Sequence, residues 1–262
     1  MDGRVQDIIA FLERDTLRNL VLLKTLAQFP RAVRCVFRSD PDGEAALLIL
    51  PGSVLGFDRA HYPSVDHVVF LAVSRLDQIP RLLAEVPAGS HLLFKLMDER
   101  HPATVDRFFA IRRVAAYHSF APPAGQRFEI GANVTVSARL AGDLLAVYTA
   151  QGHAPEEVRH HFACGARSVT VYEDGRPAST CFVYPNYGRI WEIGALTTTS
   201  ERRRRGLARA VVSAAYGVLG REGLTARYQA HESNPASIRL AESLGLQRFL
   251  VNSHWVHAGR QP

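Results

Sequence analysis

The sequence contains little cysteine. Three cysteines occur in 262 residues, and they form neither a CxxC pair nor a His/Cys cluster at zinc spacing. An odd number of cysteines without such a pattern argues against a disulfide scaffold and against a structural metal. We therefore expect a reducing, cytoplasmic environment and no bound metal ion.

The sequence also lacks a long hydrophobic run. Nowhere do about eighteen apolar residues follow one another, and the N-terminal segment interrupts its apolar residues with charges every few positions. Neither a signal peptide nor a membrane-spanning helix is expected from this pattern. Together with the scarcity of cysteine, it predicts a cytoplasmic protein that has no membrane partner.

Several signatures of nucleotide-binding and metal enzymes are missing. GxGxxG and GxxxxGK[ST] do not occur, which leaves little case for a dinucleotide-binding unit and none for a P-loop enzyme. The pair His231-Glu232 does not extend to HExxH, because position 235 is proline. The adjacent His160 and His161 diverge by about 100° on a helix and make a poor metal pair.

The composition is that of a soluble globular protein. Hydrophobic residues make up 47% of the chain, and 31 basic against 25 acidic residues give a formal charge of +6. The length allows one large domain or two smaller ones, each with a core. Most basic residues are arginines dispersed among acids, and the one basic run is at 202–205. The charge therefore does not by itself indicate nucleic-acid binding.

Hydrophobic periodicity predicts a mixture of helices and strands in the first half of the chain. A hairpin is expected around the turn at 39–44, with Asp42-Gly43 at its tip. The expected helices are two within 4–29 and one each at 76–86 and 103–111, and the expected strands are at 32–37, 45–50, 67–73, 91–96 and 114–119. Because residues 120–126 (FAPPAGQ) have the composition of a linker, a first domain is predicted over residues 1–122.

The second half, residues 127–262, is predicted to form a second α/β domain. The segment Glu173-Asp174-Gly175 is typical of a hairpin turn, and PNYG at 185–188 is expected to be a loop. The expected strands are at 133–136, 168–172, 178–184, 189–196, 225–230 and 247–257, and the expected helices are at 141–150, 155–163, 204–221 and 235–244. We expect a mixed, mostly antiparallel sheet flanked by helices.

The most informative segment runs from the strand at 189–196 into the helix at 204–221. Gly206 and Ala208 keep the start of this helix free of bulk, so that backbone N–H groups can approach a ligand closely. A helix N-terminus also carries about half a positive charge, which favours a phosphate group. The arginines at 202–205 add cationic side chains, although a solvated helix start often carries such a charge run.

The spacing Arg203-x-x-Gly206-x-Ala208 resembles the pyrophosphate-binding motif of the GCN5-related N-acetyltransferase (GNAT) superfamily, where it holds acyl-coenzyme A. The segment 234–246 (NPASIRLAESLGL) resembles the last helix of that superfamily. The resemblance covers about residues 128–257 and implies a GNAT fold. Residues 1–120 resemble more loosely the N-terminal domain of two-domain members, such as the FR47-like and glycine N-acyltransferase-like groups.

The resemblance implies roles for several residues in binding acetyl-CoA. Backbone groups of Leu196 and Thr198 would pair with the pantetheine arm, and Asn234 and Ser237 would approach the pantetheine or the thioester. The pyrophosphate would lie against Arg203, Arg204, Arg205, Gly206, Leu207 and Ala208. Asn234 is equally suited to cap the final helix, with Pro235 at its first position, and both roles are compatible.

Glu192 is the candidate general base. It lies on the strand before the motif and eleven residues before Arg203, a separation similar to that of the glutamate base in histone-acetylating members. A carboxylate near the split strand can accept the proton of an attacking amine. The alternative is an exposed or salt-bridged strand residue, because a shift of one position would turn the side chain to the other face of the sheet.

The source of the proton for the departing thiolate is less well defined. Many superfamily members have a tyrosine immediately after the leucine of N-x-x-S-x-x-L, and this sequence has Ala241 there. The proton must then come from water or from another group, for which Tyr228, His231 and Ser237 are candidates.

The predicted function is N-acetyl transfer from acetyl-CoA to a primary amine of a small molecule or amino-acid derivative, which would enter from the side of the N-terminal half. Direct attack is expected, because no cysteine with a positioned histidine is evident. Ala241 leaves open an acyl-CoA-binding sensor or regulatory module with little turnover. Binding of nucleic acid by residues 202–205 is the weakest alternative, since four residues are a small footprint. Neither the acceptor nor the oligomeric state follows from the sequence.

Overall fold

The computed structural model describes residues 3–41 and 43–258. The chain forms two compact units, of which the first contains the residues up to His118 and those from Leu250 onward, and the second contains Ser119–Phe249. The predicted domains are 1–122 and 127–262. The division in the structure differs from them because the residues from Leu250 onward belong to the first unit. Residues from Leu250 onward group with the first unit because β11 (Gln247–His257) pairs antiparallel with β4 (Leu92–Leu96).

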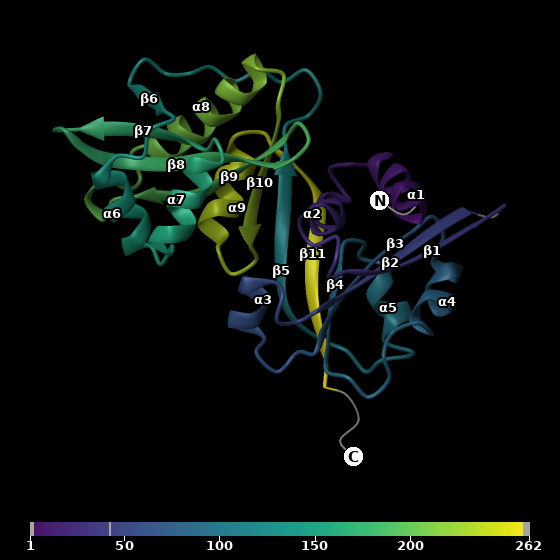
Figure 1. Ribbon diagram of the computed structural model, residues 1–262. Helices are drawn as coiled ribbons and strands as arrows, with labels where there is room; N and C mark the ends of the chain where they lie inside the picture. Colours follow the sequence, from purple (N-terminus) through teal and green to yellow (C-terminus); the bar gives the residue numbers. More distant parts are fainter. Residues whose placement is uncertain (1–2, 42, 259–262) are drawn as a thin grey trace. The chain divides into compact units, whose positions relative to one another are not determined.

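The first unit is built on a mixed sheet with the strand order β1-β2-β3-β4-β11-β5 (Figure 1). Its other strands are β1 (Arg34–Asp40), β2 (Gly43–Pro51), β3 (His67–Val73) and β5 (Arg112–Ala121). The predicted hairpin is confirmed by the antiparallel register of β1 and β2, whereas Asp42 at its tip lies outside the described residues. The pairing of β3 with β4 is parallel.

The first unit has the two helices predicted within 4–29, whereas those predicted at 76–86 and 103–111 are shorter than expected. The helices of this unit are α1 (Gly3–Glu13), α2 (Leu20–Gln28), α3 (Gly56–His61), η1 (Leu76–Gln78), α4 (Ile79–Leu83) and α5 (His101–Val105). The single helix expected at 76–86 is a 3-10 turn followed by α4, because Pro80 has no N–H with which to continue a helix from η1. The short α3 has no counterpart among the predicted elements.

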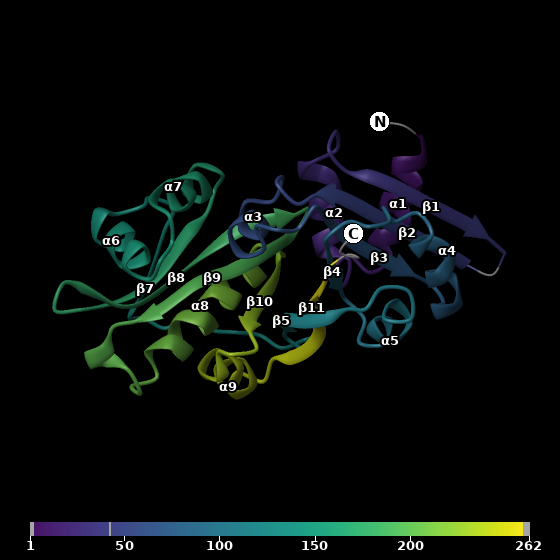
Figure 2. The ribbon, with the colours of Figure 1, turned by 90° about the horizontal axis from the view of Figure 1, so that it is seen from below.

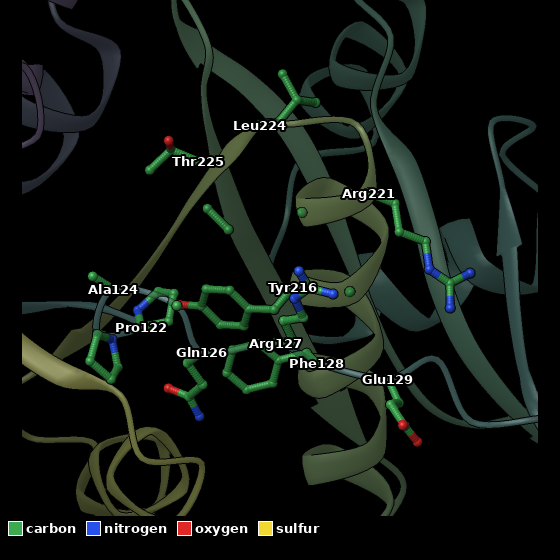
Figure 3. A pocket seen from close by; sticks show the side chains of 15 residues that line it. Pro122, Ala124, Gln126, Arg127, Phe128, Glu129, Tyr216, Arg221, Leu224 and Thr225 are labelled. Carbon is green, nitrogen blue, oxygen red and sulfur yellow. The ribbon is translucent and has the colours of Figure 1, made fainter.

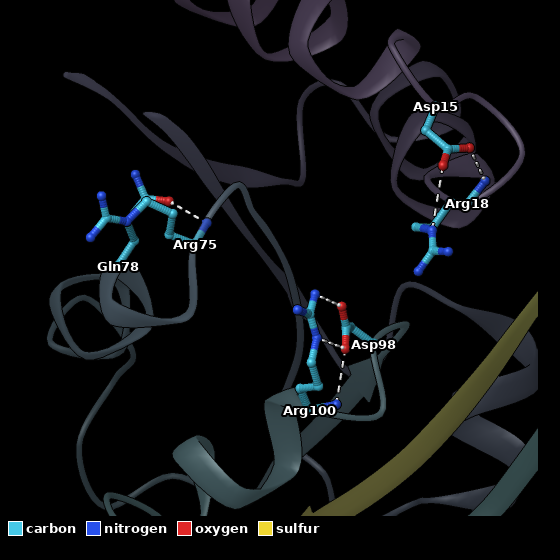
Figure 4. A network of polar contacts seen from close by, with 6 residues as sticks. All are labelled: Asp15, Arg18, Arg75, Gln78, Asp98 and Arg100. Carbon is cyan, nitrogen blue, oxygen red and sulfur yellow. Dashed lines mark hydrogen bonds and ion pairs between the residues drawn. The ribbon is translucent and has the colours of Figure 1, made fainter. Parts of the chain in front are cut away.

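Local polar contacts shape the loops between these elements (Figure 4). The backbone N–H of Arg75 donates to Oε1 of Gln78 at 3.1 Å and so starts η1. After β4, the guanidinium of Arg100 donates to both carboxylate oxygens of Asp98, at 2.9 and 2.6 Å. These bonds lower the pKa of Asp98 to about 2.

His101, the first residue of α5, makes the first unit sensitive to acid. Burial lowers its pKa from 6.5 to about 4. The unfolded chain keeps the ordinary value, so below pH 6.5 the unfolded state binds a proton that the folded state excludes. The free energy of unfolding should therefore fall between pH 6.5 and 4, by up to about 3 kcal/mol.

Denaturant titrations at pH 7 and 4.5 check this expectation. His101→Gln should remove most of the difference in stability between the two pH values. Asp98 interferes little, because its carboxyl titrates at lower pH. An equal loss of stability in the wild type and the variant would contradict the assignment.

The second unit contains a five-stranded part of the sheet with the order β10-β9-β8-β7-β6. Its strands are β6 (Val134–Ser137), β7 (Arg167–Glu173), β8 (Arg176–Tyr187), β9 (Ile190–Thr198) and β10 (Thr225–His231). The pairing of β9 with β10 is parallel, and the other three pairings are antiparallel. The expected mixed, mostly antiparallel sheet is confirmed.

Helices cover both faces of this sheet (Figure 2). They are α6 (Gly142–Ala150), α7 (Pro155–Ala163), α8 (Leu207–Arg221) and α9 (Pro235–Ser243), and the turn η2 (Ser200–Arg202) precedes α8. Alternate residues of β8 separate the two cores: Cys181 and Val183 belong to the core with α8, and Phe182 packs with α6 and α7. In the described part of the chain, none of the helices has the length and apolar character needed to span a membrane.

The turn predicted at 173–175 is confirmed, and the loop predicted at 185–188 is not. Asp174 and Gly175 both have positive φ, 52° and 71°, as a two-residue type I′ turn requires. The expected loop at 185–188 is wrong for most of its length, because β8 continues through Tyr187 while paired with β9. The register of this pairing shifts between Pro185 and Tyr187, and the turn itself is Gly188-Arg189.

Candidate functional site

Strands β9 and β10 begin as a parallel pair and then separate. Their register runs from Ile190 opposite Thr225 to Ile193 opposite Tyr228. From Gly194 onward, β9 has no β10 partner among the described residues, although its other edge remains paired with β8. Unpaired backbone groups of this kind can bind an extended ligand as an additional strand.

A β-bulge lies where the two strands separate. Cys181 of β8 is opposite two residues of β9, Ala195 and Leu196. Ala195 has a φ of 53°, a left-handed conformation that costs an alanine on the order of 1–3 kcal/mol. Such strain concentrates at functional sites. Because a bulge leaves a backbone group outside the ladder, an N–H group here can donate to a bound carbonyl oxygen.

The start of α8 has the backbone geometry of an anion site. Gly206, the N-cap of α8, has a φ of 77°, and Arg204 has a φ of 61°. The amides of the first helical turn have no intrahelical acceptor, and left-handed residues turn successive N–H groups toward one side. A Cβ at Gly206 would meet no atom within 4 Å, so its backbone conformation and not crowding explains the glycine.

The four arginines before α8 have different partners. Arg202 contacts the carboxylates of Glu173 and Asp174 at 2.9 and 2.7 Å, and Arg205 contacts Glu173 at 2.9 Å. Arg203 donates from Nε to the carbonyl oxygen of Thr198 at 3.3 Å. Arg204 is exposed. Of the arginines predicted to bind pyrophosphate, Arg203 and Arg204 are thus better placed than Arg205, which is already neutralised.

At the start of α9, Asn234 caps the helix. Its side-chain oxygen accepts a hydrogen bond from the N–H of Ser237 at 3.1 Å, which is the capping role that the sequence left open. The hydroxyl of Ser237 is hydrogen-bonded to Tyr228 of β10, and burial raises the pKa of Tyr228. Ala241 is completely buried in the core of the second unit. Tyr228 and Ser237 thus form one hydrogen-bonded pair at the last paired position of the β9–β10 register.

Glu192 forms a buried ion pair. Nε of Arg227 lies 2.9 and 3.2 Å from its two carboxylate oxygens, and Asn186 donates to one of them at 2.9 Å. Glu192 and Arg227 are each only 5% exposed. They are register partners on β9 and β10, which explains the contact. The structure therefore corresponds to the salt-bridged alternative for Glu192, and its role as a base stays a prediction.

A large cavity of the second unit lies away from the predicted site residues (Figure 3). About 670 Å³ in volume, it lies between residues 122–129 and the C-terminal half of α8. Tyr216 stacks there on Phe128, with ring centroids 4.9 Å apart. None of the predicted site residues lines it. Within residues 3–41 and 43–258, no group of three or more His, Cys, Asp or Glu side chains is arranged to hold a metal ion.

Residues 140–246 match the model of the acetyltransferase (GNAT) family. No curated protein matches the chain. Among solved structures, a GCN5-related N-acetyltransferase from Sphaerobacter thermophilus is similar, with a TM-score of 0.63 and 16% identity over 97% of this chain and 91% of that chain. A GCN5-related N-acetyltransferase from Kribbella flavida has a TM-score of 0.54 and 14% identity over 92% and 95%.

A tandem GNAT protein from the clavulanic acid biosynthesis pathway is also similar, with a TM-score of 0.55 and 16% identity over 99% of this chain and 95% of that chain. At these identities the likeness concerns the fold, and it extends over nearly the whole chain. The fold class expected from the sequence, a GNAT-type mixed sheet flanked by helices, is therefore confirmed.

Proposed function

We propose that the protein acetylates a primary amine of a small molecule or amino-acid derivative, because residues 140–246 match the model of the acetyltransferase (GNAT) family, whose members transfer acyl groups from coenzyme A. One observation carries the proposal. The strand edge that becomes free at Gly194 leads directly to a helix start with left-handed Arg204 and Gly206. An extended amide chain and a diphosphate are the two binding elements of coenzyme A that such a sequence of features can hold.

Acetyl-CoA would bind along this path and supply an activated acetyl thioester. The amides at the start of α8, over residues 203–208, suit its diphosphate, and the side chains of Arg203 and Arg204 suit the negative charge. Backbone groups of Leu196 and Thr198 suit the pantetheine arm. Asn234 and Ser237 are proposed to lie against pantetheine or thioester from the β10 side.

The residues near the freed edge can perform parts of an acyl transfer. An N–H group of the bulge at Ala195 can stabilise negative charge on the carbonyl oxygen. Tyr228, hydrogen-bonded to Ser237 and with its pKa raised by burial, keeps its proton at neutral pH and can donate it to the departing sulfur. Glu192 lies on the strand that carries the bulge and remains the predicted base for the amine.

The function is tested by measuring release of the free thiol from acetyl-CoA with a panel of primary amines, together with calorimetric binding of acetyl-CoA. We expect binding and an amine-dependent release well above the uncatalysed rate. Binding without amine-dependent release would favour the alternative of an acyl-CoA sensor. Absence of binding would remove the basis of the proposal.

We also propose a cytoplasmic location. Cys35, Cys164 and Cys181 are free thiols in the structure, and Cys164 is exposed, which suits a reducing compartment. Fractionation of cells that produce the protein, followed by thiol labelling, checks this expectation, since an oxidising compartment would convert exposed thiols.

A further inference from the structure

A small cavity of about 70 Å³ lies in the second unit between α7 and strands β8 and β9. Its walls include Glu157 and His161 of α7, Phe182 and Tyr184 of β8, and Gly194 and Ala195 of β9. It is separate from the larger cavity beside the C-terminal half of α8, with which it shares no lining residue. None of these six residues is among those predicted from the sequence to bind acetyl-CoA or to act as the base.

The cavity lies next to the place where the thioester of bound acetyl-CoA is expected. This step rests on the proposed function. If the diphosphate lies at the start of α8 and the pantetheine arm runs back along β9 from Thr198 to Leu196, the thioester reaches Ala195 and Gly194. Those two residues form the β9 wall of the cavity. An amine held in the cavity would therefore face the carbonyl carbon from the α7 side.

The walls combine a carboxylate, an imidazole and two aromatic rings. Oε1 of Glu157 lies 3.9 Å from Nε2 of His161, one helical turn away on α7. The ring centroid of His161 lies 4.2 Å from that of Tyr184 and 5.5 Å from that of Phe182. A Cβ on residue 194 would lie 3.0 Å from Cε1 of Tyr184, so Gly194 lets this ring pack on β9.

We propose that this cavity receives the terminal CH₂–NH₃⁺ group of the acceptor, with Glu157 binding the ammonium ion and His161 accepting its proton. A carboxylate attracts a cation, an aromatic ring can contribute to the attraction, and a neutral imidazole nitrogen can accept a proton. The volume suits an ammonium group with its adjoining methylene and not a quaternary or branched amine. Glu192 is less available, because its oxygens already accept bonds from Arg227 and Asn186.

The proton and electron balance of the transfer follows from these positions. Nε2 of His161 takes one proton from the ammonium group and passes it to solvent. The nitrogen lone pair then forms the bond to the carbonyl carbon, and the carbon–sulfur bond breaks with its electron pair on sulfur. The second N–H proton ends on the departing thiol. The products are the N-acetylated amine and free CoA.

Several other titratable groups surround His161. Glu157 and His160 are on α7, His153 precedes this helix, and Tyr184 faces the ring from β8. Burial raises the pKa of Tyr184, with a further contribution from Glu192, so Tyr184 is neutral over the range in which histidine titrates. A step in the pH dependence between pH 5.5 and 8, on top of the steady rise that ionisation of an aliphatic amine itself gives, would therefore come from the histidines, which substitutions can separate.

The cation site is tested first by binding alone. Propylammonium chloride is titrated calorimetrically into the protein saturated with CoA. We expect association in the wild type, at least about tenfold weaker binding in Glu157→Gln, and no binding of trimethylpropylammonium. Glu156→Gln is the matched control, because Glu156 is on the same helix and outside the cavity, and it should bind as the wild type does. Absence of binding in the wild type, or equal binding in Glu157→Gln, would overturn the proposal.

The base is tested by turnover with two amines of different basicity, propylamine and aniline. His161→Gln should lower kcat/KM for propylamine at least about 30-fold at pH 7 and change its pH profile to the steady rise given by the unprotonated fraction of the amine, while aniline, which arrives unprotonated, should lose less than about threefold. His160→Gln is the matched control, since His160 is exposed and outside the cavity. An unchanged pH profile in His161→Gln would overturn the role of His161.

The two tests also separate this inference from the proposed function. If propylammonium binds but no amine causes release of CoA, the proposed function and the base role of His161 both fail, while the cation site at Glu157 stands. If amines are acetylated but propylammonium binding does not depend on Glu157, the function stands and the cavity is not the acceptor site. Thermal unfolding of each variant shows whether the fold is intact.

Discussion

Replacing Arg227 with methionine should lower the free energy of unfolding by about 3–5 kcal/mol, because it leaves the buried carboxylate of Glu192 without its counter-ion. The two side chains are each 6% exposed and 2.9 Å apart, and Asn186 alone cannot compensate the charge. Glu192→Gln should have a cost of similar size, since it leaves the guanidinium uncompensated. Chemical denaturation of the two single variants at pH 7 measures both effects.

A double variant separates the cost of an unpaired charge from the value of the pair. Glu192→Leu combined with Arg227→Met should recover most of the stability that either single substitution loses, because no buried charge remains. The matched control is the more exposed pair of Arg167 and Glu222, whose removal should cost less than about 1 kcal/mol. Losses below 1 kcal/mol in the Glu192 and Arg227 variants would show that water or a neighbouring group replaces the missing partner.

This ion pair also bears on the catalytic prediction for Glu192. A loss of rate in Glu192→Gln has two possible origins, a missing base or a displaced β9–β10 pair. Arg227→Met disturbs the same pair and keeps the carboxylate, so the pH profiles of the two variants distinguish the origins. An unchanged rate and pH profile in Glu192→Gln would contradict the base role.

Ala208→Glu should abolish most of the affinity for acetyl-CoA, with a loss of roughly 1000-fold or about 4 kcal/mol. The added carboxylate would lie in the first turn of α8, where the diphosphate is proposed to bind, and like charges repel there. The fold itself should not suffer, because a negative charge in the first turn of a helix is favourable in the absence of a ligand. Calorimetric titration with acetyl-CoA measures the affinity, and thermal unfolding measures the stability.

Ala210→Glu is the control for this substitution. The N–H of Ala210 already donates to the carbonyl oxygen of Gly206 at 3.0 Å, so this residue belongs to the hydrogen-bonded part of α8. Its added charge lies on another side of the helix and should reduce the affinity far less. Equal losses in the two variants would indicate a general effect of charge, and unchanged binding in Ala208→Glu would place the diphosphate elsewhere.

The sequence predicted the regular elements best where a hydrophobic period continued without interruption. The strand at 67–73, the helix at 155–163 and the strand at 247–257 have the expected ends. The helix expected at 103–111 is only α5, because its apolar residues near the end pack from an irregular loop. The short α3 was missed because its six residues are too few to show a helical period.

The site was predictable only to the extent that it depends on local backbone features. The glycine at position 206 predicted an unusual backbone conformation, and the backbone of Gly206 is left-handed in the structure. The left-handed conformation of Ala195 could not be predicted, because alanine does not indicate a positive φ. The bulge that contains Ala195 depends on the pairing of β9 with β8. The contact between Glu192 and Arg227 follows from the register of two strands that are far apart in the sequence, and no local pattern specifies that register. The binding and catalytic roles of all these residues stay predictions.

The return of β11 to the first unit has a consequence for how the chain acquires its structure during synthesis. β11 lies between β4 and β5, and its pairing with β4 uses Ser253 to His257. A ribosome would therefore have to translate the whole second unit before the sheet of the first could close. Until then, the facing edges of β4 and β5 would lack their common neighbour, and a nascent chain paused before residue 250 would expose them to chaperones.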